Sequence, residues 1–115
     1  MLAERVRRVL IEVARQGQPI TYQALALKLE LVPPNTIRQL TTALEELMEQ
    51  DAAAGHPLIA ALVVSKATQG LPRQGFFECA HRLGRFQGDL DGPAAACYHQ
   101  SEFDSAVIFW GSADH

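Results

Sequence analysis

The segment "TIRQLTTALEELMEQDAAA", residues 36–54, constrains the fold of this chain more than any other stretch. Its apolar residues recur every three to four positions, as on one face of an α-helix; they are Ile37, Leu40, Leu44, Leu47 and Met48. Thr36 and Gln39 have the spacing of a capping box at the start of a helix. We therefore expect a helix that begins near Thr36, runs to about Ala54 and is the longest element.

Two shorter helices are predicted before it. An apolar stripe at helical spacing predicts an amphipathic helix over residues 2–16, which Gly17 stops. Its arginines lie off that stripe, and we expect a solvated face rather than a phosphate-binding patch; they are Arg5, Arg7, Arg8 and Arg15. "PIT" is typical of a short extended segment, after which Thr21 caps a second helix, "YQALALKLE". Pro33 and Pro34 end that segment.

The second half of the chain mixes strand, loop and helix patterns. Residues 58–65, "LIAALVVS", are apolar and β-branched, which favours a buried strand. "KATQGLPRQG" then predicts a loop, "FFECAHRLG" a short helix and "RFQGDLDG" a turn-rich segment. A last helix begins at Pro93 and ends at Gly111, with one apolar face made of Ala96, His99, Phe103, Ala106, Val107 and Trp110.

This order of elements predicts a mostly helical α+β fold. It is the order of a winged helix-turn-helix domain with short strands, in which a loop and two additional C-terminal helices replace the wing. The length of 115 residues fits one domain over 1–115. Within it, residues 18–70 form the helix-turn-helix and strand core, and residues 71–115 form the loop and C-terminal helices.

Composition limits the partners of such a domain. Ten basic and thirteen acidic residues give a formal net charge of −3, the wrong sign for a protein that coats nucleic acid. Any nucleic-acid site must therefore be local. The N-terminal "MLAERVRRVLIEVARQ" carries charges where a signal peptide needs an apolar run, so we expect a cytoplasmic protein. The longest apolar run, "PLIAALVV", is too short to span a membrane.

Three short motifs carry a resemblance to a known family. "ITYQALALKL", "NTIRQLTTAL" and "GHPLIAALVV" resemble the winged-helix half of the DNA alkyltransferases and of their non-enzymatic alkyltransferase-like relatives. In that family a "TY..LA" helix precedes a recognition helix of the form A-R-x-V-G-x-A-[LM]. The resemblance implies that Arg38 is the arginine finger that enters the base stack where a nucleotide is flipped out. It also implies that Leu40, Ala43 and Leu44 are buried.

The chemistry of that family is not expected here. Its strand delivers a P-C-H-R active site, but the corresponding stretch reads "ALVVSK" and contains neither Cys nor His. A thiolate nucleophile needs such a cysteine beside a base or cation. We expect a protein that is not an enzyme, because no nucleophile with a base and no motif of paired carboxylates is present. The chain also resembles small bacterial winged-helix proteins, which implies a fold without a function.

Neither a metal nor a nucleotide cofactor is predicted. Cys79-x-His81 and Cys97-x-His99 supply the ligand types of a zinc site. Both pairs lie in predicted helices, where residues two positions apart point about 200° apart. We therefore expect buried thiols and a hydrogen-bonded His99 in the core. No G-x-G-x-x-G or Walker sequence occurs.

The predicted DNA-binding residues lie at the tip of the longest helix. Its outward face carries Arg38 and Thr42 and then Glu45, which lies about 10 Å beyond Arg38 along the axis. Because that acidic half repels phosphates, only the N-terminal turns can enter a groove, and binding should be weak. The residues predicted to contact DNA here are Thr36, Arg38, Gln39 and Thr42.

A second basic region lies in the predicted loop after the strand. Lys66 and Arg73 precede the N-terminus of the short helix, where free N–H groups favour an anion, and Arg82 and Arg85 follow. Either this is a phosphate-contacting surface that replaces the wing, or it is an ordinary solvated loop.

Two classes of function remain open. The first is a non-enzymatic DNA-binding protein that uses the helix tip and the basic loop. The second is a protein-interaction or regulatory module that uses the acidic helix and the aromatic C-terminal helix. Tyr98 and Phe109 share a side of the last helix. They form either a homodimer contact, which would support the second class, or part of a single core.

Overall fold

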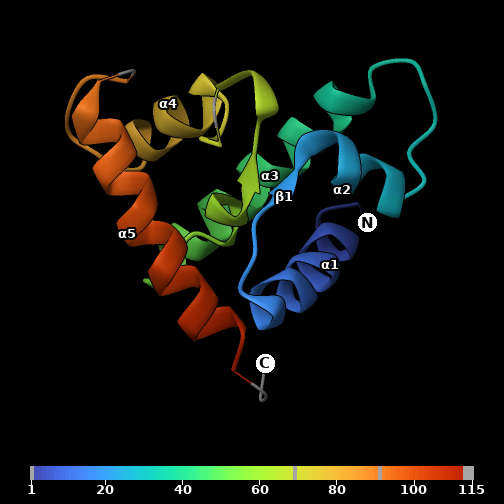
Figure 1. Ribbon diagram of the computed structural model, residues 1–115, viewed down its shortest axis with the longest axis horizontal. Coiled ribbons are helices and arrows are strands. Elements are labelled where there is room, and N and C mark those ends of the chain that lie inside the picture. Colours follow the sequence, from blue (N-terminus) through green and yellow to red (C-terminus); the bar gives the residue numbers. More distant parts are fainter. Residues whose placement is uncertain (1, 69, 91, 113–115) are drawn as a thin grey trace.

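The computed structural model describes residues 2–68, 70–90 and 92–112 (Figure 1). Gln69 and Asp91, which fall in the predicted loop and turn-rich segment, lie outside the described residues. The chain is mostly helical with two short strands, so the predicted α+β class is confirmed. The elements in order are α1 (Leu2–Gln16), β1 (Ile20–Thr21), α2 (Tyr22–Lys28), α3 (Thr36–Ala54), η1 (a 3-10 helix, Ile59–Leu62), β2 (Val63–Val64), η2 (a 3-10 turn, Lys66–Thr68), α4 (Gln74–Arg82) and α5 (Pro93–Trp110).

Most of the predicted helix ends are confirmed. α1 ends at Gln16, and Gly17 follows with a φ of +72°, a conformation that glycine adopts without steric cost. The Thr21 Oγ1 accepts a hydrogen bond of 3.1 Å from the Ala24 N–H and so caps α2. α3 ends at Ala54, and α5 begins at Pro93. α2 is shorter than expected.

The predicted strand over residues 58–65 is wrong for most of its length. Its first part forms the 3-10 helix η1, and only Val63 and Val64 pair with β1, in parallel: Ile20 lies opposite Val63, and Thr21 opposite Val64. Every residue from 58 to 63 is at most 2% exposed. A segment buried on all sides has no polar face, so its sequence carries no period that separates helix from strand.

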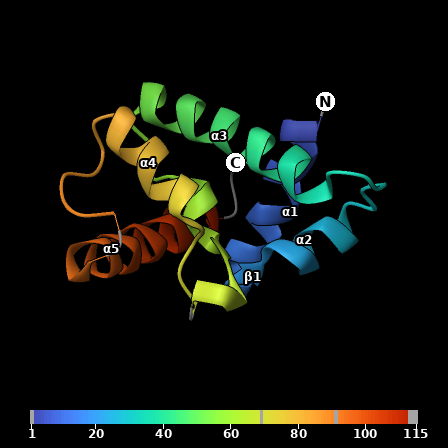
Figure 2. The same ribbon diagram turned by 90° about the horizontal axis from the view of Figure 1, so that it is seen from above.

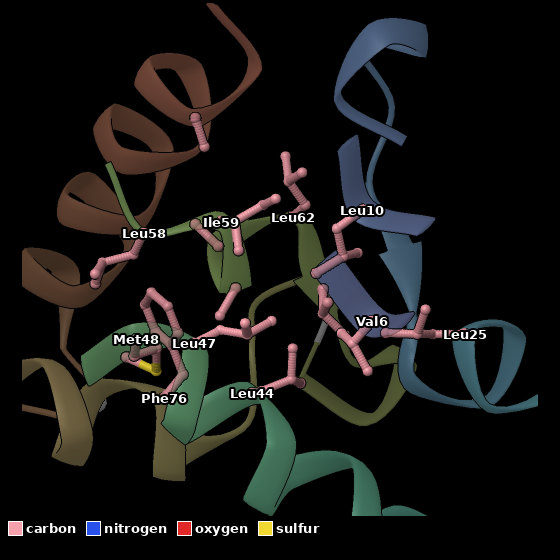
Figure 3. Packing of buried hydrophobic residues seen from close by; sticks show 14 of the residues in the cluster. Val6, Leu10, Leu25, Leu44, Leu47, Met48, Leu58, Ile59, Leu62 and Phe76 are labelled. Atoms are coloured by element: carbon pink, nitrogen blue, oxygen red, sulfur yellow. The ribbon is translucent and has the colours of Figure 1, made fainter. Parts of the chain in front are cut away.

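The segment from η1 to β2 lies at the centre of the core. Figure 3 shows Leu58, Ile59 and Leu62 of this segment among side chains from α1 and α3. The buried cluster extends from Ala3 in α1 to Trp110 in α5 and includes the three residues that the resemblance predicts to be buried, which are Leu40, Ala43 and Leu44. One core therefore holds α1, α2 and α3 together with the C-terminal helices α4 and α5.

The face that α5 turns to the core differs in part from the predicted one. His99, Ala106 and Trp110 are buried as expected. Ala96 is exposed, and its neighbour Ala95 is buried in its place. This error has a simple cause, since alanines at both positions give no signal for which of them faces inward.

One arginine of α1 is not solvated as predicted. The Arg7 Nη2 lies 2.9 Å from the Asp51 Oδ1, and Asp51 is 1% exposed. The other carboxylate oxygen of Asp51 accepts a hydrogen bond of 3.0 Å from the Ile59 N–H. The Arg7 guanidinium also lies 4.7 Å from the Trp110 ring centroid. This ion pair therefore joins α1, α3, η1 and α5.

The other arginines of α1 lie closer to solvent. Arg8 is exposed, and Arg15 pairs with Glu12 on the same helix. Arg5 is exposed too, but its Nη2 donates to the Leu29 carbonyl after α2 at 2.6 Å. Among the described helices, none is long and apolar enough to cross a membrane.

Candidate nucleic-acid interface

The start of α3 differs from the predicted capping box. Asn35 precedes the helix in the left-handed region, with a φ of 66°, and its side chain makes no capping hydrogen bond. Thr36 is the first helical residue rather than the cap. The first N–H groups of a helix have no partners within it, and here no side chain of the described residues caps them. Such N–H groups and the helix dipole favour an anion.

Gln39 has a structural role at this site. Its Nε2 donates hydrogen bonds to the carbonyl oxygens of Val32, at 3.3 Å, and Pro34, at 3.1 Å. An amide nitrogen has two hydrogens, so both are used in holding the loop before α3. The predicted contact of Gln39 with a base is therefore limited to its amide oxygen. This is also why the predicted capping box does not form, because the side chain points to the loop.

Arg38 and Thr42 remain available. Both are exposed, and both line a shallow open groove together with Leu2, Pro34 and Asn35. Within the part of the chain that the structure describes, the Arg38 guanidinium makes no ion pair or hydrogen bond. The charge at the tip of α3 is thus free to meet a ligand.

The second basic region contains a compact turn rather than an irregular loop. A bridge between Ser65 and Leu71 closes it, with a hydrogen bond of 2.8 Å from the Ser65 N–H to the Leu71 carbonyl. Lys66 lies exposed in η2, at the start of this turn. α4 begins at Gln74, earlier than the predicted Phe76.

Arg73 immediately precedes α4 and is also exposed. Its backbone N–H donates to the Tyr22 hydroxyl at 3.1 Å, and its guanidinium lies 5.6 Å from the centre of the Tyr22 ring. Burial raises the pKa of Tyr22, so its hydroxyl stays protonated. The first turn of α3, η2 and the start of α4 lie at the top of Figure 1 and face the viewer in Figure 2.

The two remaining arginines of the predicted cluster are engaged with the protein itself. The Arg82 Nη1 lies 3.4 Å from the Glu49 Oε2. Arg85 is partly buried, where it donates to the His56 carbonyl at 2.6 Å and contacts Glu102 at 3.3 Å. The basic surface that is free of carboxylate partners among the described residues is therefore smaller than predicted, with Lys66 and Arg73 as its charges.

A small cavity lies between α2, α3, η1 and α4. Its lining residues include Tyr22, Glu45, Ala60, Arg73 and Phe76. It has a volume of about 30 Å³, which is room for a water molecule but not for a nucleobase. This cavity therefore cannot take up a nucleobase.

The cysteine and histidine pairs are split between core and surface. Cys79 is buried, but Cys97 is exposed, so the prediction of two buried thiols is wrong for Cys97. Cys97 lies two residues from both Ala95 and His99, which face the core, and positions two apart on a helix diverge.

His99 is a hydrogen-bonded core residue, as predicted. Its Nε2 lies 2.9 Å from the Ala61 carbonyl oxygen, and burial lowers the pKa of His99. Over residues 2–68, 70–90 and 92–112, no group of three or more His, Cys, Asp or Glu side chains has a metal-binding arrangement.

Asn35 is the feature of this site that the helical pattern misses. A signal for it is present, because Asn tolerates the left-handed region better than other non-glycine residues and here follows two prolines.

Comparison with protein-family models, with curated protein sequences and with solved structures finds no match to this chain.

Proposed function

We propose that this protein is a non-enzymatic, cytoplasmic DNA-binding protein of the winged-helix type. In this proposal α2 and α3 form the helix-turn-helix, and the turn from η2 to α4 takes the place of the wing. The observation that carries it is Arg38, which is exposed and has no ion-pair or hydrogen-bond partner among the described residues, beside the uncapped start of α3. A phosphate at that position would meet a guanidinium, free N–H groups and the positive end of a helix dipole.

The distribution of charge supports a tip-first approach of α3 to DNA. Arg38 and Thr42 lie in the first two turns, whereas Glu45 and Glu49 are exposed further along the helix. Side docking would bring these carboxylates against phosphates. Insertion of the N-terminal turns keeps them away. η2 and the start of α4 lie on the same side of the molecule as the first turn of α3 (Figure 2), so Lys66 in η2 and Arg73 before α4 then approach the DNA backbone.

In this proposal Arg38 acts at the DNA surface of the protein. It binds the phosphate beside a distorted base pair, where opening the pair costs least. The stretch "ALVVSK" offers no nucleophile for alkyl transfer, and the cavity behind α3 is too small for an extruded base. The protein would thus bind distorted duplex without changing it.

One observation favours the second class, a protein-interaction module. Ile108 on α5 is 74% exposed, and Glu45 and Glu49 form an acidic surface on α3. Tyr98 and Phe109 add little to such a surface, because both pack against the core. A simple measurement distinguishes the two classes, since only the DNA-binding class predicts salt-dependent binding of DNA.

The test of the proposal is the salt dependence of DNA binding with Lys66→Ala/Arg73→Ala. Each lost phosphate contact lowers the slope of log K against log salt concentration by about 0.9 for duplex DNA. We expect a flatter slope and a similar loss of affinity for every sequence, because phosphate contacts carry no base information. Arg8→Ala on α1 is the control and should bind as the wild type does. An unchanged slope in the double variant would show that this turn does not contact DNA.

A further inference from the structure

The loop between α2 and α3 forms an exposed apolar corner. It projects from the molecule at the upper right of Figure 1. Leu27 at the end of α2 is 79% exposed, and Val32 in the loop is 74% exposed. Pro33 and Pro34 are exposed as well. Exposing several large apolar side chains within one short segment of the chain is unfavourable in water, which suggests that a ligand covers them.

This corner is held in place from two sides. The Gln39 amide binds the carbonyl oxygens of Val32 and Pro34, and the Arg5 guanidinium binds the carbonyl of Leu29. The proline rings further restrict the backbone on the C-terminal side of Val32. Val32 is therefore presented on a fixed support, and Gln39, which binds its carbonyl oxygen, is the neighbour of Arg38 in α3.

The charges around the corner fit a nucleic acid. Arg5 binds Leu29, Lys28 ends α2 and Arg38 follows the loop in α3, and all three are exposed. The exposed acidic residues are Glu30 in the loop and Glu4 next to Arg5. This is a local excess of positive charge in a chain whose net charge is −3. An aliphatic side chain between cations is complementary to a base step flanked by phosphates.

We propose that Val32 is an apolar wedge that inserts into a weakened base step of duplex DNA while Arg38 holds the adjacent phosphates. The inference rests on the proposed DNA-binding function and specifies its ligand as duplex with a mismatch or another unstacked step. Leu27 covers the neighbouring sugar. The cost of separating two bases is offset by the contact of Val32 with their faces, and this cost is lowest where stacking is already weak.

The experiment uses Val32→Thr, which keeps the branched shape but replaces a methyl group by a hydroxyl. Ile108→Thr is the matched control, because Ile108 is equally exposed but lies on α5. Affinity is measured for a matched duplex and for one with a single mismatch, with 2-aminopurine beside the mismatch to report unstacking. For Val32→Thr we expect about tenfold weaker binding of the mismatched duplex and loss of the 2-aminopurine signal, with little change for the matched duplex. Ile108→Thr should behave as the wild type does.

Two results would overturn the wedge, and they separate it from the proposed function. If the wild type binds DNA and Val32→Thr binds each duplex as tightly as the wild type does, with an unchanged 2-aminopurine signal, the wedge is wrong but DNA binding stands. If the wild type binds neither duplex at low salt, both proposals fail. In that case, a loss of self-association in Val32→Thr would assign the corner to a second copy of the chain.

Discussion

Arg7 and Asp51 show how single residues fix the arrangement of helices in this protein. The Asp51 carboxylate is almost inaccessible and has two partners, Arg7 and the Ile59 N–H. Burial raises the pKa of Asp51, while these two partners lower it. Taking a charge out of water is costly, so the removal of Arg7 leaves a buried carboxylate without its ion-pair partner.

Arg7→Met should lower the free energy of unfolding at pH 7 by about 3 kcal/mol. Without Arg7 the pKa of Asp51 rises further. A carboxyl group with a raised native pKa stabilises the folded state at low pH, and this contribution is lost as pH rises through the native pKa. The loss should therefore shrink as pH falls from 7 toward the unfolded pKa of Asp, near 4. Urea denaturation at several pH values measures it.

Arg8→Met is the matched control for that experiment, because Arg8 is exposed on the same helix. It should stay within about 0.5 kcal/mol of the wild type at every pH. An Arg7→Met variant whose loss is the same at pH 7 and pH 5 would contradict the role assigned to Asp51.

Asn35 carries a second prediction at this scale. Its φ of 66° lies in the left-handed region, which strains a residue with a Cβ atom but not glycine. Asn35→Ala should cost about 1 kcal/mol of stability, and Asn35→Gly should stay within about 0.5 kcal/mol of the wild type. Thermal denaturation of the two variants provides the comparison. Equal stabilities for Ala and Gly would mean that the left-handed conformation does not matter at this position.

At the scale of elements, α3 has two ends of opposite character. Its start carries Arg38 and free N–H groups, and its later turns carry exposed carboxylates. One of these, Glu49, pairs with Arg82 across to α4. Both side chains are about half exposed, so this pair contributes little to stability. Its effect should instead be on the charge that α4 offers to a ligand.

Glu49→Gln should therefore free Arg82 and raise DNA affinity about twofold at low salt, with almost no change in melting temperature. In an Arg82→Gln background the same change should have a smaller effect. A double-mutant cycle measured by DNA titration checks this coupling. If the gain is identical in both backgrounds, it comes from general repulsion by Glu49, and Arg82 has no role in binding.

The elements also show where sequence patterns are sufficient and where they fail. α1, α3 and α5 have strong helical periods or end signals, and their bounds agree with prediction. The 58–62 stretch has no polar face, so nothing in it separates a 3-10 helix from a strand. The spacing of Thr36 and Gln39 wrongly predicted a capping box, because the Gln39 side chain binds the loop instead. That contact depends on the path of the chain before the helix, which the spacing does not reveal.

At the scale of the whole molecule, the charged side chains that are free and those that are paired are distributed unevenly around a single core. The exposure of Arg38 and Thr42 could be predicted from helical periodicity and that of Lys66 and Arg73 from their place in a predicted loop, and all four are exposed. The partners of Arg82 and Arg85 could not, because Glu49 and Glu102 come from helices whose packing the sequence does not reveal. Long-range pairs of this kind decide which charges of a small acidic protein remain free for a ligand.

The measurement that tests this account most directly is a fluorescence titration of mismatched duplex with wild type and Arg38→Ala at two salt concentrations. The wild type should bind, and more weakly at the higher salt concentration. Arg38→Ala should lose about 1–3 kcal/mol of binding free energy. Its stability should stay within about 0.5 kcal/mol of the wild type, because Arg38 is exposed and makes no ion pair or hydrogen bond within residues 2–68, 70–90 and 92–112. Equal binding by both proteins, or no binding by the wild type at low salt, would contradict the account.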